Sequence, residues 1–241
     1  VDDLITTKPH KSDKLEKMAE EEILKGRFFH PMSRADADIF FGRGNWRPMP
    51  LFVVEQASKD RLISDARRGG HNAAVKEIET IYVPSIDLIP EIVSALAFAI
   101  SESPWGGRGD TEDSSVHPSP SSSTHWLPPW AEPVMGTEDL DEAYGQCPAR
   151  PDQRNACIVA WHSPTLGWRF AEAKGLVFGL SAAVVGFNRW PALITATFRR
   201  FFAGLGANYF DDFLVISSLI EASQSRRCLT EAAALNGGSF G

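Results

Sequence analysis

Two adjacent carboxylates, Asp211 and Asp212, are the residues of this sequence with the clearest capacity for chemistry. They follow the turn-rich stretch 204–208 and precede the β-prone run 213–216. This pattern predicts a strand–turn–strand hairpin with both acids at its tip. A solvated polar turn would have the same residues. The apolar flanks favour a functional site, because acids between hydrophobic strands cost stability unless solvent or cations neutralise them.

A second acidic cluster occupies residues 138–142, earlier in the chain. If the stretch before it is a strand, one of its carboxylates can face the Asp211–Asp212 hairpin. Three carboxylates with no His or Cys nearby form a hard oxygen ligand set, which suits Mg²⁺ or Mn²⁺ better than zinc. Two such ions can stabilise the attacking and leaving oxygens of an in-line phosphoryl displacement.

Four motifs, in the family's order along the chain, resemble those of reverse transcriptases. Y-F-D-D-F at 209–213 resembles their Tyr-x-Asp-Asp box, and D-L-D-E-A-Y from Asp139 resembles their first aspartate motif. Between them, G-L-V-F-G-L-S-A-A-V-V-G-F from Gly175 resembles the L-P-F-G-L-x-x-A-P-x-x-F motif of retrotransposon enzymes. Earlier, K-D-R-L-I-S-D-A-R from Lys59 resembles the fingers segment that holds the incoming nucleotide, K-x-R-x-x-x-D-x-R with a later Asn. The resemblance covers about residues 45–220 and is nearest to long-terminal-repeat or DIRS-like retroelement enzymes.

The resemblance implies that Asp139, Asp211 and Asp212 are the catalytic residues and bind two Mg²⁺ or Mn²⁺ ions. Tyr209 and Phe210 complete the box that contains the second and third aspartates. The implied reaction is attack of a primer 3′-hydroxyl on the α-phosphate of a deoxynucleoside triphosphate (dNTP).

Five further residues are implied to bind the dNTP. Lys59 and Arg61 align with residues that contact the triphosphate, where cations offset developing negative charge. Tyr144 falls where the family places an aromatic ring that blocks a sugar 2′-hydroxyl, although alone it also fits an ordinary half-buried aromatic residue. Gly179 would let template or nucleotide approach the backbone closely, and Ser181 is placed to cap the following helix.

The elements that position these residues follow from local patterning. Strong helix formers predict a charged surface helix within 11–27, and apolar periodicity predicts a buried helix within 85–101 and a main helix over 180–203. Short strands are expected at 51–54 and 61–63. The expected fold class is α+β. The resemblance specifies the fingers and palm of a right-hand polymerase, with an antiparallel, ferredoxin-like palm sheet backed by helices.

Five consecutive segments are expected along the chain. They are an N-terminal charged helical extension at 1–41, fingers at 42–100, a Ser/Pro/Gly-rich insertion at 101–133, a palm at 134–220 and a truncated C-terminal segment at 221–241. The insertion has too few apolar residues for a core and is expected to be disordered. The thumb and later domains are expected to be absent, which marks the chain as a fragment of a polyprotein.

Composition excludes several other classes of protein. Of 241 residues, 43% are hydrophobic and 23% charged, which excludes collagen-like and wholly disordered chains. Three cysteines at unrelated spacings indicate neither a disulfide framework nor a zinc site, and favour a reducing compartment. Neither a G-x-S-x-G hydrolase motif nor a G-x-x-x-x-G-K-[ST] phosphate loop occurs. With no signal peptide and no unbroken apolar span, we expect an intracellular protein, cytoplasmic or nuclear, that is neither secreted nor in a membrane.

The net charge of −7 argues against nucleic-acid binding through overall charge. The charge is unevenly distributed, however. Residues 42–76 contain seven basic and three acidic residues, and residues 174–208 contain four basic residues and no acid. Because the local field steers a charged ligand, these stretches remain compatible with nucleotide and template binding.

The sequence is therefore interpreted as an RNA-directed DNA polymerase that synthesises DNA from dNTPs on an RNA or DNA template–primer. The alternative is a degenerate or domesticated palm domain that binds nucleic acid or a partner without polymerase activity. The sequence leaves the oligomeric state undetermined.

Overall fold

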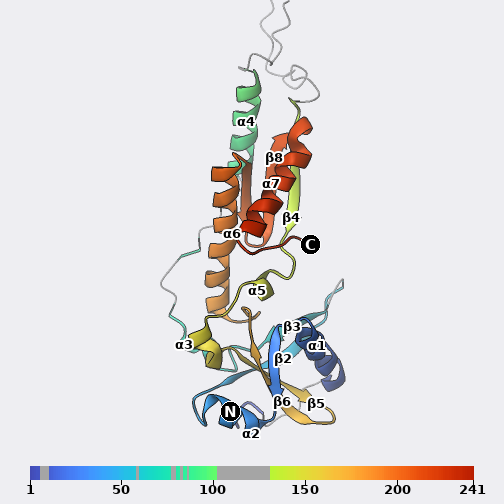
Figure 1. Cartoon of the computed structure of the whole chain (residues 1–241), viewed down its shortest axis with the longest axis vertical. Helices are drawn as coiled ribbons and strands as arrows, with labels where there is room; N and C mark the ends of the chain where they lie inside the picture. The colour runs from blue at the N-terminus through green and yellow to red at the C-terminus, as the bar shows by residue number, and fades with distance from the viewer. Residues whose placement is uncertain (6–10, 58–59, 77–79, 82–83, 86, 102–130) are drawn as a thin grey trace, which may run out of the picture. The chain divides into compact units, whose positions relative to one another are not determined.

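The computed structural model describes residues 1–5, 11–57, 60–76, 80–81, 84–85, 87–101 and 131–241 (Figure 1). Its helices, its mixed five-stranded sheet and its antiparallel three-stranded sheet confirm the α+β class. Contacts divide the chain into two compact units, each built from two separate stretches. The first unit comprises Val1–Ile81 and Glu142–Arg189, and the second comprises Tyr82–Asp141 and Trp190–Gly241. Residues 134–220, expected as one palm segment, are therefore shared between the units. The expected insertion lies almost wholly outside the described residues.

The first unit contains a five-stranded mixed sheet in the order β1-β6-β5-β2-β3, in which β2 and β5 are parallel and the other neighbours antiparallel. Its strands are β1 (Phe28–Met32), β2 (Pro48–Val54), β3 (Arg61–Ser64), β5 (Ile158–Ser163) and β6 (Gly167–Ala173). Its helices are α1 (Ser12–Leu24), α2 (Arg34–Phe41), α3 (His71–Ala74), α5 (Ala143–Gln146) and the 3-10 helix Pro151–Ala156. The helix predicted within 11–27 and the strands predicted at 51–54 and 61–63 are confirmed.

Both faces of this sheet are covered, because successive residues of a strand point to opposite sides. On one face, Trp161 packs in a buried cluster with Leu15 of α1. On the other, Ala160 packs with Trp46 and with Ala37 of α2. The two clusters hold the sheet between α1 and α2, and β3 is its edge strand beyond β2.

The second unit contains a three-stranded antiparallel sheet in the order β4-β8-β7. Its elements are β4 (Pro133–Asp139), β7 (Leu205–Tyr209), β8 (Asp212–Ser218), the 3-10 helix Leu219–Glu221, and the helices α4 (Leu88–Ser101) and α7 (Ala222–Leu235). A long helix, α6 (Ser181–Phe201), contributes residues 181–189 to the first unit and 190–201 to the second. It confirms the helix predicted over 180–203.

Helices α7 and α4 both contact β4 and β8. The side chains of Phe213 and Val215 in β8 and of Leu229 in α7 are buried. The prediction of a buried helix within 85–101 is correct in its position and wrong in its burial. No residue of α4 whose side chain is described is buried, and Phe98 is 67% exposed. The apolar periodicity specified a helix but not the partner that would cover it.

None of the helices in the described part of the chain combines the length and apolar character that a membrane crossing requires.

Candidate active site

The predicted hairpin is present at the end of the three-stranded sheet. Strands β7 and β8 are joined by the two-residue turn of Phe210 and Asp211, and Tyr209 pairs with Asp212. Phe210 has a φ of 52°, a left-handed conformation that is unfavourable for a bulky residue. The side-chain amide of Asn208 donates a hydrogen bond to the Phe210 carbonyl at 3.4 Å. The rare backbone conformation at Phe210 thus lies directly beside the two predicted catalytic acids.

The end of β4 brings the first predicted aspartate to this hairpin. Asp139 lies directly opposite Asp212 in the antiparallel register of β4 and β8. Residues opposite each other in such a pair share one face of the sheet, with Cβ atoms about 4.5–5.5 Å apart. The backbone N–H of Leu140 donates to the carbonyl of Asp211 at 3.2 Å, which ties the turn to the same chain end. All three acids implied by the motif resemblance therefore belong to one edge of one sheet.

The opposite face of the same strand carries an acid in a different environment. Glu138 precedes Asp139, so it points to the other side of the sheet, and its side chain is only 9% exposed. A guanidinium nitrogen of Arg226 in α7 donates to it at 3.0 Å. Asp211 and Asp212, by contrast, have no hydrogen-bond or ion-pair partner for their carboxylates among the described residues. Arg226 therefore balances the charge of Glu138, whereas no described residue balances the charges of Asp211 and Asp212.

Exposed carboxylates are suitable donors for the proposed metals. Mg²⁺ usually keeps several waters and binds through one or two protein carboxylates and the substrate's phosphates. In the part of the chain that the structure describes, no three His, Cys, Asp or Glu side chains converge as a complete protein-only metal site. Metal binding by Asp139, Asp211 and Asp212 stays a prediction, and the oxygen chemistry of these residues fits the ions.

In the first unit, the predicted nucleotide-binding glycine has a packing role. Gly179 has a φ of 100°, and a Cβ at this position would collide with the carbonyl oxygen of Ser64 at the end of β3. The N–H of Ser64 in turn donates to the carbonyl of Phe178 at 2.9 Å. Close approach of the loop to β3 therefore explains the glycine without a ligand.

Ser181 is the first residue of α6 rather than the residue before it, and its predicted capping of this helix stays a prediction. Its hydroxyl donates to Oδ1 of Asn72 at 3.3 Å, and its backbone N–H donates to the same atom at 2.9 Å. Asn72 therefore supplies the acceptor for the first turn of α6. The sequence interpretation of the candidate site did not include Asn72, and its only signal there is the later Asn of the fingers motif.

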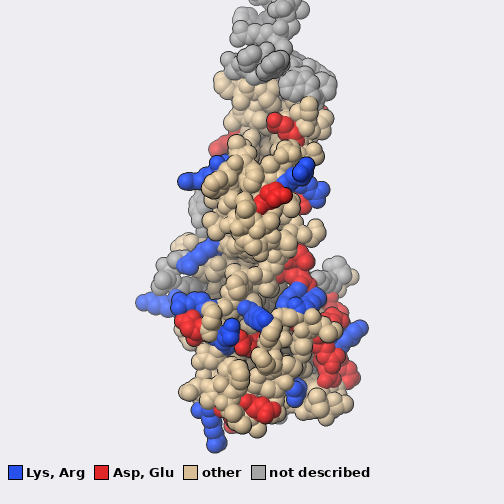
Figure 2. Space-filling view, in the orientation of Figure 1, with Lys and Arg blue, Asp and Glu red and all other residues tan. Residues whose placement is uncertain are grey.

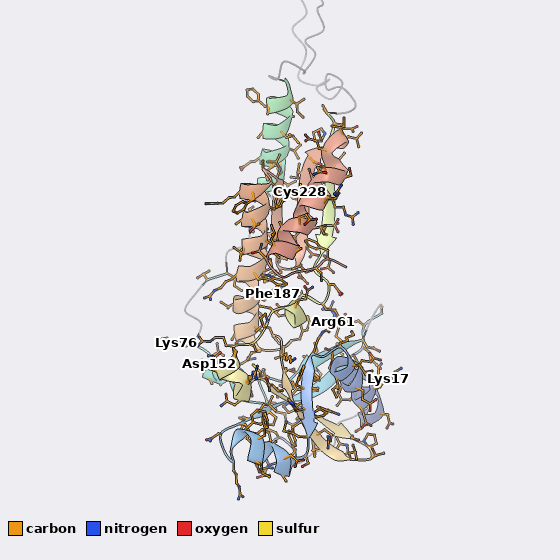
Figure 3. The ribbon with its side chains drawn as sticks, viewed as in Figure 1. Lys17, Arg61, Lys76, Asp152, Phe187 and Cys228 are labelled. Carbon is orange, nitrogen blue, oxygen red and sulfur yellow. The ribbon has the colours of Figure 1, made fainter. Side chains whose placement is uncertain are left out.

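Tyr144 lies on α5, half-buried, in an aromatic cluster. Its ring stacks on that of Phe187 with a centroid distance of 4.5 Å and an interplanar angle of 26°. It also contacts the ring of Phe178 at 4.6 Å. Phe187 lies on the part of α6 that belongs to this unit (Figure 3) and is fully buried, whereas Phe178 is 41% exposed. The cluster fixes one side of the Tyr144 ring.

An acid within the first aspartate motif, Glu142, is also fixed in place. Glu142, at a φ of 48°, accepts from Lys25 at 2.5 Å and forms an ion pair with Arg27. Arg27 also pairs with Glu22 at 3.1 Å. These contacts tie the start of α5, and hence the segment before Tyr144, to the end of α1.

Of the two cations predicted to contact the triphosphate, the structure describes Arg61 but not Lys59. Arg61 is exposed on the edge strand β3 (Figure 3), and its guanidinium has no hydrogen bond or ion pair to any residue that the structure describes. Lys59 lies outside the described residues. The contact of Arg61 and of Lys59 with the triphosphate stays a prediction for both residues.

The acids near Arg61 are neutralised by α1, where Figure 2 shows acidic and basic side chains gathered together. Lys14 pairs with Glu55 at 2.8 Å and with Asp60 at 2.7 Å. Lys11 adds a second pair to Glu55, and the hydrogen bonds from these two lysines lower the pKa of Glu55 to about 2. Two of the three acids of residues 42–76 are therefore paired with lysines from outside that stretch, and Arg47 of the stretch pairs with Asp3.

Comparison with models of known protein families finds no match, and comparison with curated proteins finds none either.

Proposed function

We propose that this chain is the fingers and palm portion of an RNA-directed DNA polymerase from a retrotransposon. The observation that carries the proposal is the register that places Asp139 opposite Asp212, with Asp211 in the adjoining turn. Motifs far apart in the sequence had implied these three acids, and the sheet brings their backbones to one edge. In this proposal the three-stranded sheet is the core of a ferredoxin-like palm.

The proposed reaction is template-directed DNA synthesis by two-metal phosphoryl transfer. Bound Mg²⁺ or Mn²⁺ would activate the primer 3′-hydroxyl and neutralise charge on the α-phosphate and the departing pyrophosphate. Asp139, Asp211 and Asp212 supply the negative charge that holds the ions. Arg61, whose guanidinium has no partner among the residues that the structure describes, would bind the triphosphate, because a bidentate cation stabilises charge that develops on phosphate oxygens.

The residues of the first unit have proposed roles in choosing the nucleotide. Tyr144, fixed by its contacts with Phe178 and Phe187, would exclude a sugar 2′-hydroxyl by steric contact. Gly179 and Ser181 would act by shaping the loop beside it rather than through the nucleotide itself. The template–primer and dNTPs are the proposed partners, and the cytoplasm or nucleus is the proposed compartment.

Primer extension on an RNA template, with a DNA primer, dNTPs and Mg²⁺ or Mn²⁺, tests the proposal. We expect extension by the unmodified chain and none by Asp211→Asn, with the same circular dichroism spectrum for both. Glu231→Gln is the matched control, because it removes an exposed acid of the same unit on α7. Equal extension by Asp211→Asn would contradict the proposal. Template–primer binding without extension in either metal would instead identify a degenerate palm that only binds nucleic acid.

A further inference from the structure

One side chain in the first unit, that of Asn72, joins two segments that are far apart in the sequence. Its Nδ2 donates to the carbonyl of Gly179 at 2.9 Å. Its Oδ1 accepts from the N–H of Ser181 at 2.9 Å and from the Ser181 hydroxyl at 3.3 Å. One amide therefore spans the loop 178–181 from both sides, and it does so from α3, more than a hundred positions earlier.

Only an amide of this length fits these contacts. The Gly179 carbonyl requires a donor, whereas the Ser181 N–H requires an acceptor, and Asn carries both on one planar group. An Asp at the same position would keep the acceptor at the start of α6, where negative charge is favourable. It would lose the donor and place a carboxylate against a carbonyl oxygen. The two halves of the contact can thus be separated by substitution.

The loop that Asn72 fixes is the one that presents Phe178 to Tyr144. The carbonyl of Phe178 accepts from the N–H of Ser64, and the next carbonyl accepts from Asn72. With both carbonyls held, the Phe178 ring contacts Tyr144 at 4.6 Å while remaining 41% exposed. The second neighbour of Tyr144, Phe187, is buried and on a helix, so Phe178 is the more movable of the two. A looser loop would therefore release Tyr144 on this side.

We propose that Asn72 is a positioning residue that sets the discrimination between deoxyribonucleotides and ribonucleotides, by holding the loop 178–181 against the Tyr144 ring. This inference rests on the proposed polymerase function. Asn72 acts through Tyr144 and Phe178 and makes no contact with substrate in the proposal.

The test compares kcat/KM for a dNTP with that for the matching ribonucleoside triphosphate in Asn72→Ala. We expect the ratio to fall by roughly tenfold, through a lower KM for the ribonucleotide and a higher KM for the dNTP, since all three hydrogen bonds from Asn72 to the loop are lost. In a Tyr144→Ala background, Asn72→Ala should leave the ratio unchanged, because the ring through which it acts is gone. A residue needed only for folding would lower both activities together and leave the ratio intact in either background.

Two further variants complete the test. Asn155→Ala is the matched control, since its exposed amide also donates to a backbone carbonyl of this unit, that of Asn45, and we expect no change in the ratio. Asn72→Asp retains the acceptor for Ser181, so it carries the test if Asn72→Ala fails to fold. For Asn72→Asp we expect slow hydrogen exchange at the Ser181 amide together with a reduced ratio.

The outcomes separate the two proposals. If the unmodified chain extends primers and neither Asn72 variant changes the ratio, the role of Asn72 is overturned and the polymerase function stands. If the ratio changes equally with and without Tyr144, the route through that ring is overturned. If the unmodified chain extends no primer in either metal, the polymerase function is overturned, and the selectivity role with it.

Discussion

The loop 178–181 in the first unit and the hairpin 209–212 in the second both carry residues that are predicted to bind the nucleotide or its metal ions. The two regions differ in the hydrogen-bond partners of their polar groups. In the loop, the Asn72 side chain hydrogen-bonds to Gly179 and Ser181, and the N–H of Ser64 donates to the carbonyl of Phe178. At the hairpin, the Asp211 and Asp212 carboxylates have no such partners in the described structure. Packing alone therefore explains the loop, whereas the acids require solvent or a cation. The hairpin is accordingly the better candidate for the catalytic centre.

Substitution of one residue from each region gives the largest expected difference. Asp212→Asn should lower the rate of primer extension by about a thousandfold or more, because a ligand that stabilises transition-state charge is worth several kcal/mol. Ser181→Ala should lower it by less than about tenfold, since only one weak hydroxyl contact to Asn72 is lost and the backbone N–H contact remains. Single-turnover extension rates measure both. Equal losses would show that Ser181 meets the substrate directly and that the comparison is wrong.

The glycine of the loop provides the next largest effect, on stability. Gly179→Ala should lower the free energy of unfolding of the first unit by about 3 kcal/mol, because the new Cβ meets the Ser64 carbonyl and the φ of 100° is unfavourable for Ala. Gly167→Ala is the matched control, with a φ of 72° and open space around its Cβ. It should cost about 1 kcal/mol, from the backbone alone. Urea denaturation compares the two, and similar values would contradict the packing explanation for Gly179.

The same contrast explains which features were predictable from sequence. The hairpin and α6 follow from turn residues and apolar periodicity within one continuous segment, and both were predicted. The contact of Asn72 with Ser181 joins segments more than a hundred residues apart, and nothing in either segment specifies it. Burial of α4 was predicted wrongly for a related reason, since periodicity describes a helix face but not what lies against it. Interleaving of the two units likewise depends on long-range contacts that local patterns do not encode.

Metal binding should stabilise the unit that contains Asp211 and Asp212, whose carboxylates have no partner among the described residues. We expect Mg²⁺ in the millimolar range, about tenfold above an assumed dissociation constant, to raise the free energy of unfolding of the second unit by about 1.4 kcal/mol. In Asp212→Asn this gain should shrink, and without metal that variant should be more stable by about 0.5 kcal/mol because one of the crowded negative charges is removed. Thermal unfolding with Mg²⁺ and with EDTA measures both changes. A gain that survives in Asp212→Asn would place the ion elsewhere.

The smallest expected effect is a pH dependence of stability near Asn72, the residue that anchors the loop 178–181. His71 directly precedes Asn72 in the sequence. Burial of the His71 imidazole lowers its pKa. A hydrogen bond with the Arg47 backbone raises this pKa in part, and the positive charge of Arg47 lowers it. The folded state therefore binds a proton less readily than the unfolded chain, whose His pKa is about 6.5. Stability from this group is complete above that value and declines as the pH falls below it.

Acidification from pH 7.5 to 5.5 should therefore destabilise the first unit slightly, and His71→Gln should flatten this part of the pH dependence. The protonated ring would lie beside Asn72, so hydrogen exchange at the Ser181 amide should accelerate over the same pH range in the unmodified chain. The rates are first corrected for the intrinsic pH dependence of exchange. We expect no such acceleration in His71→Gln. An amide within β8, such as that of Val215, is the internal reference, since it belongs to the other unit. If exchange at Ser181 and Val215 responds to pH equally, the acid effect is global unfolding. A response confined to Ser181 locates it at the Asn72 anchor, because Asn72 follows His71 in the sequence and its side chain accepts from the Ser181 N–H.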